Sequence, residues 1–567
     1  MQIWKLRESQ TPKPTGPFPD LIARVLASRE ITQDNLENLL QPKLSGLSDP
    51  NLMLGMEKAV SRLVQAFKND EKICIYADFD LDGTSGLAIL KIGLENLGFK
   101  HVAYYQPKRL SEGYGFHAGA VTELQHLGIS LIVTVDVGIT SFKAFERANE
   151  LGVDVILTDH HLPAETLPNA YVVVNPNQKA CRSGLGYLCG AGVAFYLLRA
   201  LKRAFFEDSA LPKKEWDLKE VLEFFCIGTV TDMVPLIHDN RVLVKHGLVA
   251  LAETKRPGLR TLLEALKLNS RELTSQDVAI RFAPKLNALS RLENNVLPAQ
   301  IYLETDFKKA QNMVSHILEN NQTRQNLQGD AEAKAFEMLA DWSEKDFVFV
   351  SSDLFHRGVI GLIATKLSQH FNCPAFVGSK NSEGMIVGSS RAPNGSSISL
   401  VEALKASETV LNRFGGHAAA AGFELHETNE ERFLQFLKQH FAAMKMTPKP
   451  VQLDFDTTAD ITEINVHAMK WHDFIGPYGM GFHVPLLQIH SVKVSSVKEL
   501  KGGHLKLSLS GNDLAQSKVD ALLFSPTPML KEITKAGGHY HILAELQWNY
   551  FNGKKTIQLL VKDLKLA

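Results

Sequence analysis

The stretch Ala77-Asp78-Phe79-Asp80-Leu81-Asp82-Gly83 places three carboxylates at alternate positions, directly after the apolar run Ile73-Cys74-Ile75-Tyr76. Asp is disfavoured in strands, and three like charges at this spacing repel one another unless a cation or a basic cluster lies among them. An apolar-periodic segment, Leu87 to Leu97, follows Gly83-Thr84, so the order predicts a strand, an acidic turn and a helix. Ligands bind at such turns in open α/β sheets, and a multivalent metal is the simplest partner for this one. The alternative for this segment alone is a solvated acidic turn or a helix N-cap cluster.

The same rhythm of apolar run and polar turn recurs further along the chain. Leu131 to Val135 is followed by Asp136, and Val155 to Thr158 is followed by Asp159-His160-His161. Short apolar runs that alternate with helical patterns predict a parallel sheet with crossover helices. Because parallel strands bring their carboxyl ends to one edge, we expect these groups to converge with the acidic turn.

Each of these signals is weak when taken separately. A lone Asp at a strand end is usually a helix cap, and a His pair is more often structural than ligating. Three such groups at one edge favour a metal site, and oxygen ligands with imidazole and no cysteine suit Mn²⁺ or Mg²⁺ better than a structural zinc. The carboxylates suffice for two ions. Asp232, within Gly228 to Pro235, is a further candidate that alone would indicate only a turn.

Size and composition exclude several classes of protein. A chain of 567 residues is too long for one core and implies roughly three or four domains. With 45% apolar and 22% charged residues, it is neither disordered nor fibrous. The sequence shows neither a signal-peptide pattern nor a membrane-length apolar segment, and its five cysteines form no CxxC pair, so we expect a cytoplasmic protein with reduced thiols and no membrane partner. The net charge of −1 neither demands nor excludes a polyanionic partner.

The acidic and histidine motifs together resemble the DHH phosphoesterase superfamily and, within it, the RecJ single-strand exonucleases. The resemblance rests on DFDLDG at 78–83, VDVG at 135–138, TDHH at 158–161 and GTVTDMVPL at 228–236, and it extends to RLSEGYGF at 109–116, NPNQ at 175–178 and LCGAGVAFYL at 188–197. These motifs are specific, and the match spans most of the chain.

The resemblance implies a role for each of these residues. It implies two ions, Mn²⁺ or Mg²⁺, held by six metal ligands: Asp78, Asp80, Asp82, Asp136, His160 and Asp232. Asp136 would bridge the ions. Among the catalytic residues that it implies besides Asp136, His161 would contact the phosphate or assist proton transfer, and Asp159 would orient the histidine pair.

Two later regions resemble parts of the family that bind the substrate. RFAPKLNALSRL at 281–292 reads on its own equally well as a basic exposed face, and it departs from the family pattern at Lys285 and at Leu289-Ser290, where Arg and Ala-Gly are usual. Gly388 to Arg391 and Gly415 to Gly422 resemble the DHH-associated domain, although Ala392 replaces a usual Ser and the second motif alone would favour a tight turn followed by a helix of small residues. The implied substrate-binding residues are Arg109, Arg281, Ser389, Arg391, Gly415, Gly416 and His417.

The patterns divide the chain into five parts. We expect an N-terminal extension at 1–45, a parallel-sheet DHH domain at 46–304, a linking helix at 305–342 that Gly329 could interrupt, a DHH-associated α/β domain at 343–447, and a small antiparallel barrel at 448–567. The resemblance implies an OB-fold for the barrel, whose lysines and aromatic residues suit single-stranded nucleic acid, although half of such aromatics would be core. Phe482-His483 replaces the family's usual Asn-Pro after the glycine turn at 476–481.

The resemblance implies a 5′→3′ exonuclease specific for single-stranded DNA. It would release nucleoside 5′-monophosphates in DNA repair and recombination, with single-strand-binding protein and a DNA helicase as partners. The alternative is another phosphoesterase of the superfamily, acting on short oligonucleotides, cyclic dinucleotides or pyrophosphate. A non-catalytic scaffold is disfavoured because all the ligand residues are present.

Overall fold

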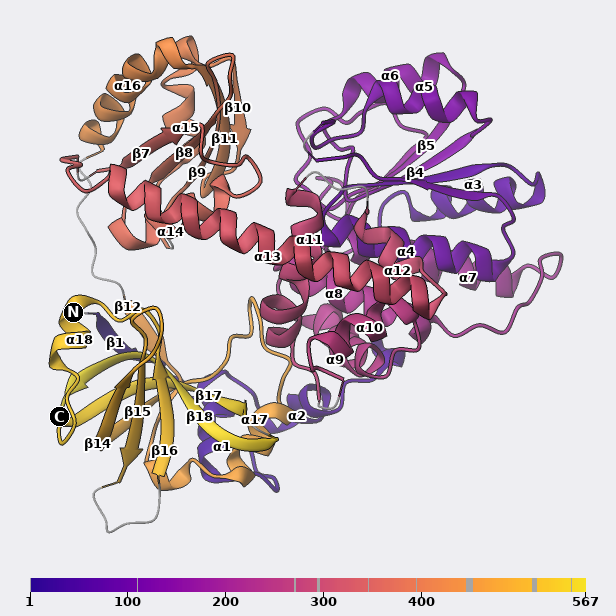
Figure 1. Cartoon of the computed structure of the whole chain (residues 1–567). Helices are drawn as coiled ribbons and strands as arrows, with labels where there is room; N and C mark the ends of the chain where they lie inside the picture. The colour runs from indigo at the N-terminus through magenta and orange to yellow at the C-terminus, as the bar shows by residue number, and fades with distance from the viewer. Residues whose placement is uncertain are drawn as a thin grey trace.

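The computed structural model describes residues 2–109, 111–269, 272–292, 296–344, 346–393, 395–444, 452–511, 518–551 and 553–567. Figure 1 shows two α/β units connected by a long helix, with a barrel on the remaining side. No helix within these ranges is long and apolar enough to cross a membrane.

The first α/β unit is built on a five-stranded parallel sheet of order β3-β2-β4-β5-β6. Its strands are β2 (Ile73–Ala77), β3 (Val102–Tyr105), β4 (Leu131–Val135), β5 (Asp154–Thr158) and β6 (Val172–Val174). Ala77 pairs with Val135, and Val135 pairs with Thr158. The residues that follow these three strands therefore lie side by side at one edge, as the sequence predicts.

Helices cover both faces of this sheet. The core on one face includes residues of α3 (Met56–Lys68), α4 (Leu81–Leu97) and α7 (Gly190–Glu207), while α5 (Ala118–His126) and α6 (Phe142–Glu150) pack on the other. The first core extends into a helical region formed by α8 (Leu222–Asp232), α9 (His238–Ala252), α10 (Pro257–Ala265), α11 (Ala283–Arg291) and α12 (Pro298–Leu303). Strands buried on both faces are typical of parallel sheets.

Helix α13 (Phe307–Met338) connects the two α/β units (Figure 1). Its 32 residues span about 48 Å, and Gly329 lies within it without interrupting it. Val314 and Ile317 pack into the core of the first unit, whereas Ala331 and Ala335 pack into that of the second. The helix therefore acts as a spacer that both cores hold.

The second α/β unit has a five-stranded sheet of order β10-β11-β9-β8-β7. Its strands are β7 (Val348–Ser352), β8 (Ala375–Lys380), β9 (Met385–Arg391), β10 (Arg413–Gly416) and β11 (Ala420–His426), and its helices are α14 (Ile360–Phe371), α15 (Leu400–Lys405) and α16 (Glu430–Ala443). Gly415 and Gly416 end strand β10 of a hairpin, so no helix of small residues follows them. Gly416 has a φ of 138°, and a Cβ there would lie 2.5 Å from the Ala420 carbonyl oxygen, so the turn requires glycine.

The C-terminal sheet closes into a barrel through pairing of β14 with β17. Its strands are β13 (Thr457–Ala459), β14 (Leu486–Glu499), β15 (Leu505–Ser510), β16 (Lys518–Leu523), β17 (His539–Phe551) and β18 (Lys554–Leu566), accompanied by α17 (Val466–Phe474) and α18 (Pro528–Ile533). Two pairings, β13 with β14 and β16 with β18, are parallel, so the barrel is not purely antiparallel as the sequence suggests.

The N-terminal residues share the core of this barrel. Strand β1 (Ile3–Leu6) pairs with β12 (Gln452–Phe455), and side chains of α1 (Asp20–Ser28) and α2 (Gln33–Leu40) are buried among barrel residues. Leu21 and Leu26, for example, belong to the same apolar cluster as Ile489 and Leu507. The first 40 residues and the last 110 thus fold together, although both α/β units separate them in sequence.

A buried arginine joins the barrel to the first α/β unit. Arg241 of α9 donates hydrogen bonds to the carbonyl oxygens of Pro477, at 2.9 Å, and Gly476, at 3.1 Å, and also to that of Ile475. Its guanidinium lies 4.2 Å from the ring centroid of Phe482, which Arg29 of α1 also approaches, at 4.8 Å. Burial lowers the pKa of Arg241 to about 10. The Phe482 ring therefore lies against Arg29 of α1 and Arg241 of α9, where these two helices meet the segment that leads into the barrel.

We predict that Arg241→Ala lowers the free energy of unfolding by about 2 to 4 kcal/mol, because three carbonyl groups lose a charged donor in a buried place. Urea unfolding followed by tryptophan fluorescence measures the effect. The matched control is Arg260→Ala, which removes an exposed ion pair with Glu264 and is expected to cost less than about 0.5 kcal/mol. Equal urea midpoints for Arg241→Ala and the wild type would contradict the role of Arg241 in holding the barrel to the first α/β unit.

Candidate metal centre

The acidic turn after β2 is held in place by backbone hydrogen bonds. Asp80 is the N-cap of α4, and its carboxylate accepts hydrogen bonds from the N–H groups of Asp82, at 2.9 Å, and Gly83, at 3.0 Å. Asp82 is fully buried, and its two oxygens accept from the N–H groups of Gly190, at 2.6 Å, and Ala191, at 2.8 Å. These groups open α7, so the positive end of that helix stabilises the Asp82 carboxylate.

Asp136 occupies the centre of the site in a strained backbone conformation. Its φ of 61° lies in the left-handed region, which non-glycine residues rarely adopt outside functional sites. A Cβ on Gly190 would lie 2.4 Å from the Asp136 Cβ, so only glycine permits this approach of α7. Asp136 Oδ1 lies 3.1 Å from His160 Nε2.

The histidine pair follows β5 and faces the carboxylates. His160 Nε2 lies 3.7 Å from both Asp82 Oδ2 and Asp232 Oδ2. The buried Asp159 accepts hydrogen bonds from the His160 and His161 N–H groups, at 2.7 and 3.1 Å, and its Oδ1 lies 2.7 Å from His161 Nδ1. Asp159 therefore orients the histidine pair.

The ligand atoms fall into three compact groups, each with its atoms within 4.8 Å of one another: Asp78, Asp80 and Asp136; Asp82, His160 and Asp232; and Asp136, His160 and His161. In the described part of the chain, four buried atoms in these groups lack a hydrogen-bond partner of acceptable geometry: Asp78 Oδ1, Asp136 Oδ1, His160 Nε2 and Asp232 Oδ2. Buried polar atoms are normally paired, so unpaired donors and acceptors that converge fit bound cations. Asp136 belongs to two groups and can contact ions on either side.

Burial and mutual repulsion perturb the protonation of these groups. Burial, followed by the charge of Asp80, raises the pKa of Asp78 to about 8, and burial with Asp82 raises the pKa of Asp232 to about 8. For Asp136, burial and then the charges of Asp82 and Asp80 place the pKa well above its usual value. For His161, burial favours the neutral form, but the Asp159 carboxylate outweighs it and raises the pKa to about 9. Without a cation, Asp78 and Asp232 therefore retain protons near neutral pH.

Several supporting residues have no individual role in the sequence-based prediction. Asn175 and Asn177 donate side-chain hydrogen bonds to the carbonyl oxygens of His161, at 2.9 Å, and His160, at 2.5 Å. Gln106 donates to the carbonyl oxygen of Asp78 at 2.8 Å. The asparagines follow β6 at the same edge of the sheet, so the rule that located Asp136 could have indicated them too.

Beside the carboxylates lies a cluster of four arginines from different elements. Arg109 precedes α5, Arg291 ends α11, Arg324 lies on α13 and Arg391 ends β9. Burial, and then the charges of Arg109, Arg324 and Arg391, lower the pKa of Arg291 to about 10, while Asp78 and Asp80 act on Arg109 in the opposite sense. Arginines that repel one another at the border of two domains are suited to bind an anion, because an anion such as phosphate relieves the repulsion.

The other predicted substrate-binding residues lie at different distances from this cluster. Arg391 donates to Ser389 Oγ at 2.9 Å, so these two form one unit. The hairpin turn with Gly415, Gly416 and His417 is exposed, and its strand β11 pairs Ala420 with Arg391. Arg281 instead points away, because it contacts Asp277 at 3.6 Å and donates to the Leu266 carbonyl oxygen at 3.2 Å. Arg291, which the sequence suggests only as part of a basic face, contributes in its place.

Comparisons with known proteins agree with this architecture. Residues 72–229 match the model of the DHH family N-terminal domain, residues 345–443 match the DHHA1 domain, and residues 455–563 match the RecJ OB domain. The single-stranded-DNA-specific exonuclease RecJ of Dickeya dadantii is 31% identical over 99% of each chain. The crystal structure of RecJ from Thermus thermophilus in complex with Mn²⁺ has a TM-score of 0.78 at 27% identity and covers 100% of this chain and 80% of its own. The corresponding Mg²⁺ complex has a TM-score of 0.71 at 25% identity, covering 100% and 78%. Both ions are those that the donor set predicts.

We predict that the metal-free protein becomes less stable as the pH rises from about 5 to 8. In this window the folded chain holds protons on Asp78 and Asp232 that the unfolded chain, with a carboxyl pKa near 3.8, has released. Because the folded state then binds more protons than the unfolded state, raising the pH lowers the free energy of unfolding. Thermal unfolding of EDTA-treated protein at pH 5, 6.5 and 8 measures this trend.

Added Mn²⁺ should reverse the trend, because a cation binds the ionised carboxylates and stabilises the folded state most at pH 8. A metal-free protein whose stability increased over this window, or a Mn²⁺ effect that was larger at pH 5 than at pH 8, would show that these carboxylates are not the perturbed groups.

Proposed function

This chain belongs to the RecJ family of single-stranded-DNA-specific exonucleases, and on that premise we propose that it hydrolyses single-stranded DNA from the 5′ end, releasing nucleoside 5′-monophosphates in DNA repair and recombination. The observation that carries the proposal is the position of Asp136. It lies between two groups of potential metal ligands, and a cluster of arginines lies beside them. A scaffold protein would have no need for this combination, whereas phosphodiester hydrolysis requires both parts.

Each ligand group has a defined part in this proposal. Asp78 and Asp80 hold one divalent ion, Asp82, His160 and Asp232 hold the other, and Asp136 is shared. Two Mn²⁺ or Mg²⁺ ions held there would lower the pKa of coordinated water and neutralise charge on the scissile phosphate. The α7 N-terminus orients the Asp82 carboxylate through two backbone hydrogen bonds.

His161 is suited to transfer a proton to the departing oxygen. Its raised pKa keeps the imidazole protonated near neutral pH, and Asp159 accepts the hydrogen bond from Nδ1. The second ring nitrogen, Nε2, is then the donor toward a phosphate oxygen. The ring is 35% exposed, so substrate can reach it.

The arginine cluster positions the substrate. Arg109 and Arg291 belong to the first domain and Arg391 to the second, so a phosphate bound among them contacts both. Arginine forms bidentate hydrogen bonds with phosphate but cannot bind a cation, which separates its role from that of the carboxylates. Ser389 supports Arg391, and the exposed hairpin with Gly415, Gly416 and His417 adds an imidazole at the adjoining strand end.

The barrel binds the long single strand of DNA in this proposal. Phe524, Tyr550 and Phe551 are exposed on it, and Lys555 Nζ lies 4.3 Å from the Trp548 ring centroid and 5.6 Å from that of Tyr550. Exposed aromatics beside lysines suit base stacking with backbone contacts. A phosphoesterase specific for dinucleotides has no use for such a surface. Single-strand-binding protein and a DNA helicase are the proposed partners, since both act on the strand that this enzyme would digest, and the cytoplasm is the proposed location.

The proposed activity predicts that a single strand labelled at its 5′ end loses its label first. Purified protein is incubated with Mn²⁺ and strands labelled at either end, and the released products are followed over time. Early release of a 5′-labelled mononucleotide supports the proposal. Loss of the 3′ label first would reverse the polarity, and digestion of a dinucleotide but not of a long strand would favour the alternative phosphoesterase.

The same assay separates substrate residues from metal ligands. Arg391→Ala should lower kcat/KM by roughly 10- to 100-fold, the loss expected for a charged hydrogen bond to phosphate, while Mn²⁺ binding stays unchanged. The matched control is Arg413→Ala, because Arg413 is 74% exposed on β10, which β11 separates from β9, and pairs with Glu424. Loss of bound Mn²⁺ in Arg391→Ala would contradict the assignment.

A further inference from the structure

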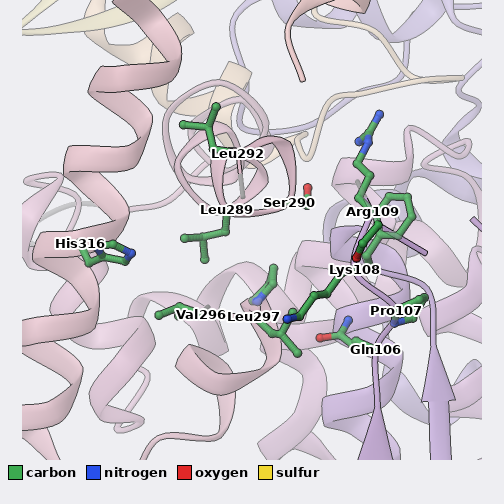
Figure 2. Close-up of a pocket in the computed structure, with 13 residues that line it drawn as sticks. Gln106, Pro107, Lys108, Arg109, Leu289, Ser290, Leu292, Val296, Leu297 and His316 are labelled. Atoms are coloured by element: carbon green, nitrogen blue, oxygen red, sulfur yellow. The ribbon is translucent and has the colours of Figure 1, made fainter. Parts of the chain in front are cut away.

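A cavity of about 600 Å³ opens directly beside the acidic turn (Figure 2). Phe79, which lies between Asp78 and Asp80, contributes to its wall, so the cavity begins where the ligand groups end. Arg109 also lines it, with its guanidinium 5.2 Å from the Phe79 ring centroid. Two lining residues belong to the site described above: Arg109 of the arginine cluster, and Gln106, which supports the acidic turn. The other lining residues have no part in the proposed hydrolysis.

The two walls of the cavity differ in chemistry. Leu289, Leu292 and Leu297 give an apolar wall, and Figure 2 shows Leu289 and Leu292 between His316 and the loop that follows β3. That loop provides Lys108 and Arg109 on the opposite side. A free phosphate would leave the apolar wall unfilled, and a purely apolar ligand would leave the cations without a partner. A volume of this size, with an apolar wall on one side and cationic and polar side chains on the other, suits a small organic ligand that carries a negative charge.

One polar atom in the wall has no partner. Gln106 is 5% exposed, and its amide nitrogen donates to the Asp78 carbonyl oxygen and to Thr84 Oγ1, at 2.8 and 2.9 Å. Its Oε1 is buried and, within the described residues, accepts no hydrogen bond. Figure 2 shows this oxygen on the side of Lys108 and Leu297. Because two donated hydrogen bonds fix the orientation of the amide, the oxygen is an acceptor that an N–H group of a ligand can satisfy.

We propose that the cavity is a nucleoside subsite that holds the base and sugar of the terminal nucleotide while its phosphate lies at the arginine cluster. This inference rests on the proposed function and names the part of the substrate that the cavity receives. Arg109 connects the two regions, because its charge interacts with Asp78 and Asp80 while the residue lines the cavity. A phosphate beside Arg109 therefore places the attached nucleoside at the mouth.

The unpaired oxygen of Gln106 gives the subsite a preference among bases. Adenine and cytosine carry an exocyclic amino donor where thymine carries a carbonyl acceptor. A terminal adenosine or cytidine satisfies Gln106, whereas a terminal thymidine places a second acceptor against it. We expect release of a first dA or dC to exceed release of a first dT by roughly 3- to 10-fold in kcat/KM, the range for one neutral hydrogen bond.

The test compares strands that differ only in their 5′-terminal nucleotide: dA, dT or an abasic residue with the same phosphate. The wild-type protein should show a higher kcat/KM for the dA strand than for the abasic strand. Leu289→Trp fills the apolar wall, so the ratio between these two strands should fall toward one. Leu127→Trp is the matched control, since Leu127 is exposed just before β4, at the opposite edge of the sheet, and should leave the ratio unchanged.

A second variant addresses the base preference separately. Gln106→Met keeps the side-chain length but removes the acceptor, and it should bring the dA to dT ratio close to one. A wild-type protein that cleaves the dA and abasic strands equally well, or a Leu289→Trp variant that keeps the wild-type ratio, would overturn the subsite.

Equilibrium binding of dAMP and of deoxyribose 5-phosphate to the full chain distinguishes failure of the subsite from failure of the proposed function. Tighter binding of dAMP, lost in Leu289→Trp, supports the subsite even if no strand is cleaved. Equal binding of the two compounds by the wild-type protein would overturn it whether or not the strands are cleaved.

Discussion

Electrostatic repulsion among the buried carboxylates at one edge of the parallel sheet is the constraint on which the rest of this structure depends. Asp78, Asp82 and Asp136 are each at most 3% exposed, and burial together with the neighbouring carboxylate charges raises the pKa values of Asp78 and Asp136. Like charges in such a place cannot all ionise without a counter-charge. The fold tolerates the repulsion because strands β2, β4 and β5 hold the turns rigidly in register, and divalent cations supply the missing charge.

The surrounding elements each relieve part of this repulsion without neutralising the site. The N-terminus of α7 stabilises Asp82, and the hydrogen bonds around Asp159 are strong enough to lower its pKa although burial opposes ionisation. The arginines are close enough for Arg109 to interact with Asp78 and Asp80, yet their mutual repulsion leaves room for an anion. The arginine cluster therefore lies beside an acidic centre. The arginines suit the phosphate of the substrate, and the carboxylates suit metal ions. Helix α13 keeps the two domains that provide this arginine cluster at a fixed separation.

The sequence predicts the metal centre well because the rule behind it is geometric. Parallel strands place their carboxyl ends at one edge, so Asp136 and His160 could be located without knowing the strand order. The arginine cluster could not be predicted in the same way, since its members come from four elements and two domains. Arg281 and Arg291 look equivalent in the basic stretch, but Asp277, four residues before Arg281, draws that side chain away. No local pattern records that α1 and α2 complete the barrel core, because the contacts join residues more than 400 positions apart. Family resemblance, more than periodicity, indicated the residues of the second domain.

The most direct measurement of the central claim is a calorimetric titration of Mn²⁺ into the wild-type protein and into Asp136→Asn. If Asp136 is shared between two ions, the wild type binds two per chain, and the variant binds at most one in the same range. The affinity of the variant for the second ion should fall by more than about 100-fold, since mutation of even an outer-shell partner of a metal site typically lowers metal affinity 10- to 100-fold. The Asp136→Asn substitution should also stabilise the metal-free protein slightly at pH 8, because it removes one negative charge that repels the neighbouring carboxylates. Two ions bound to Asp136→Asn with wild-type affinity would contradict the account.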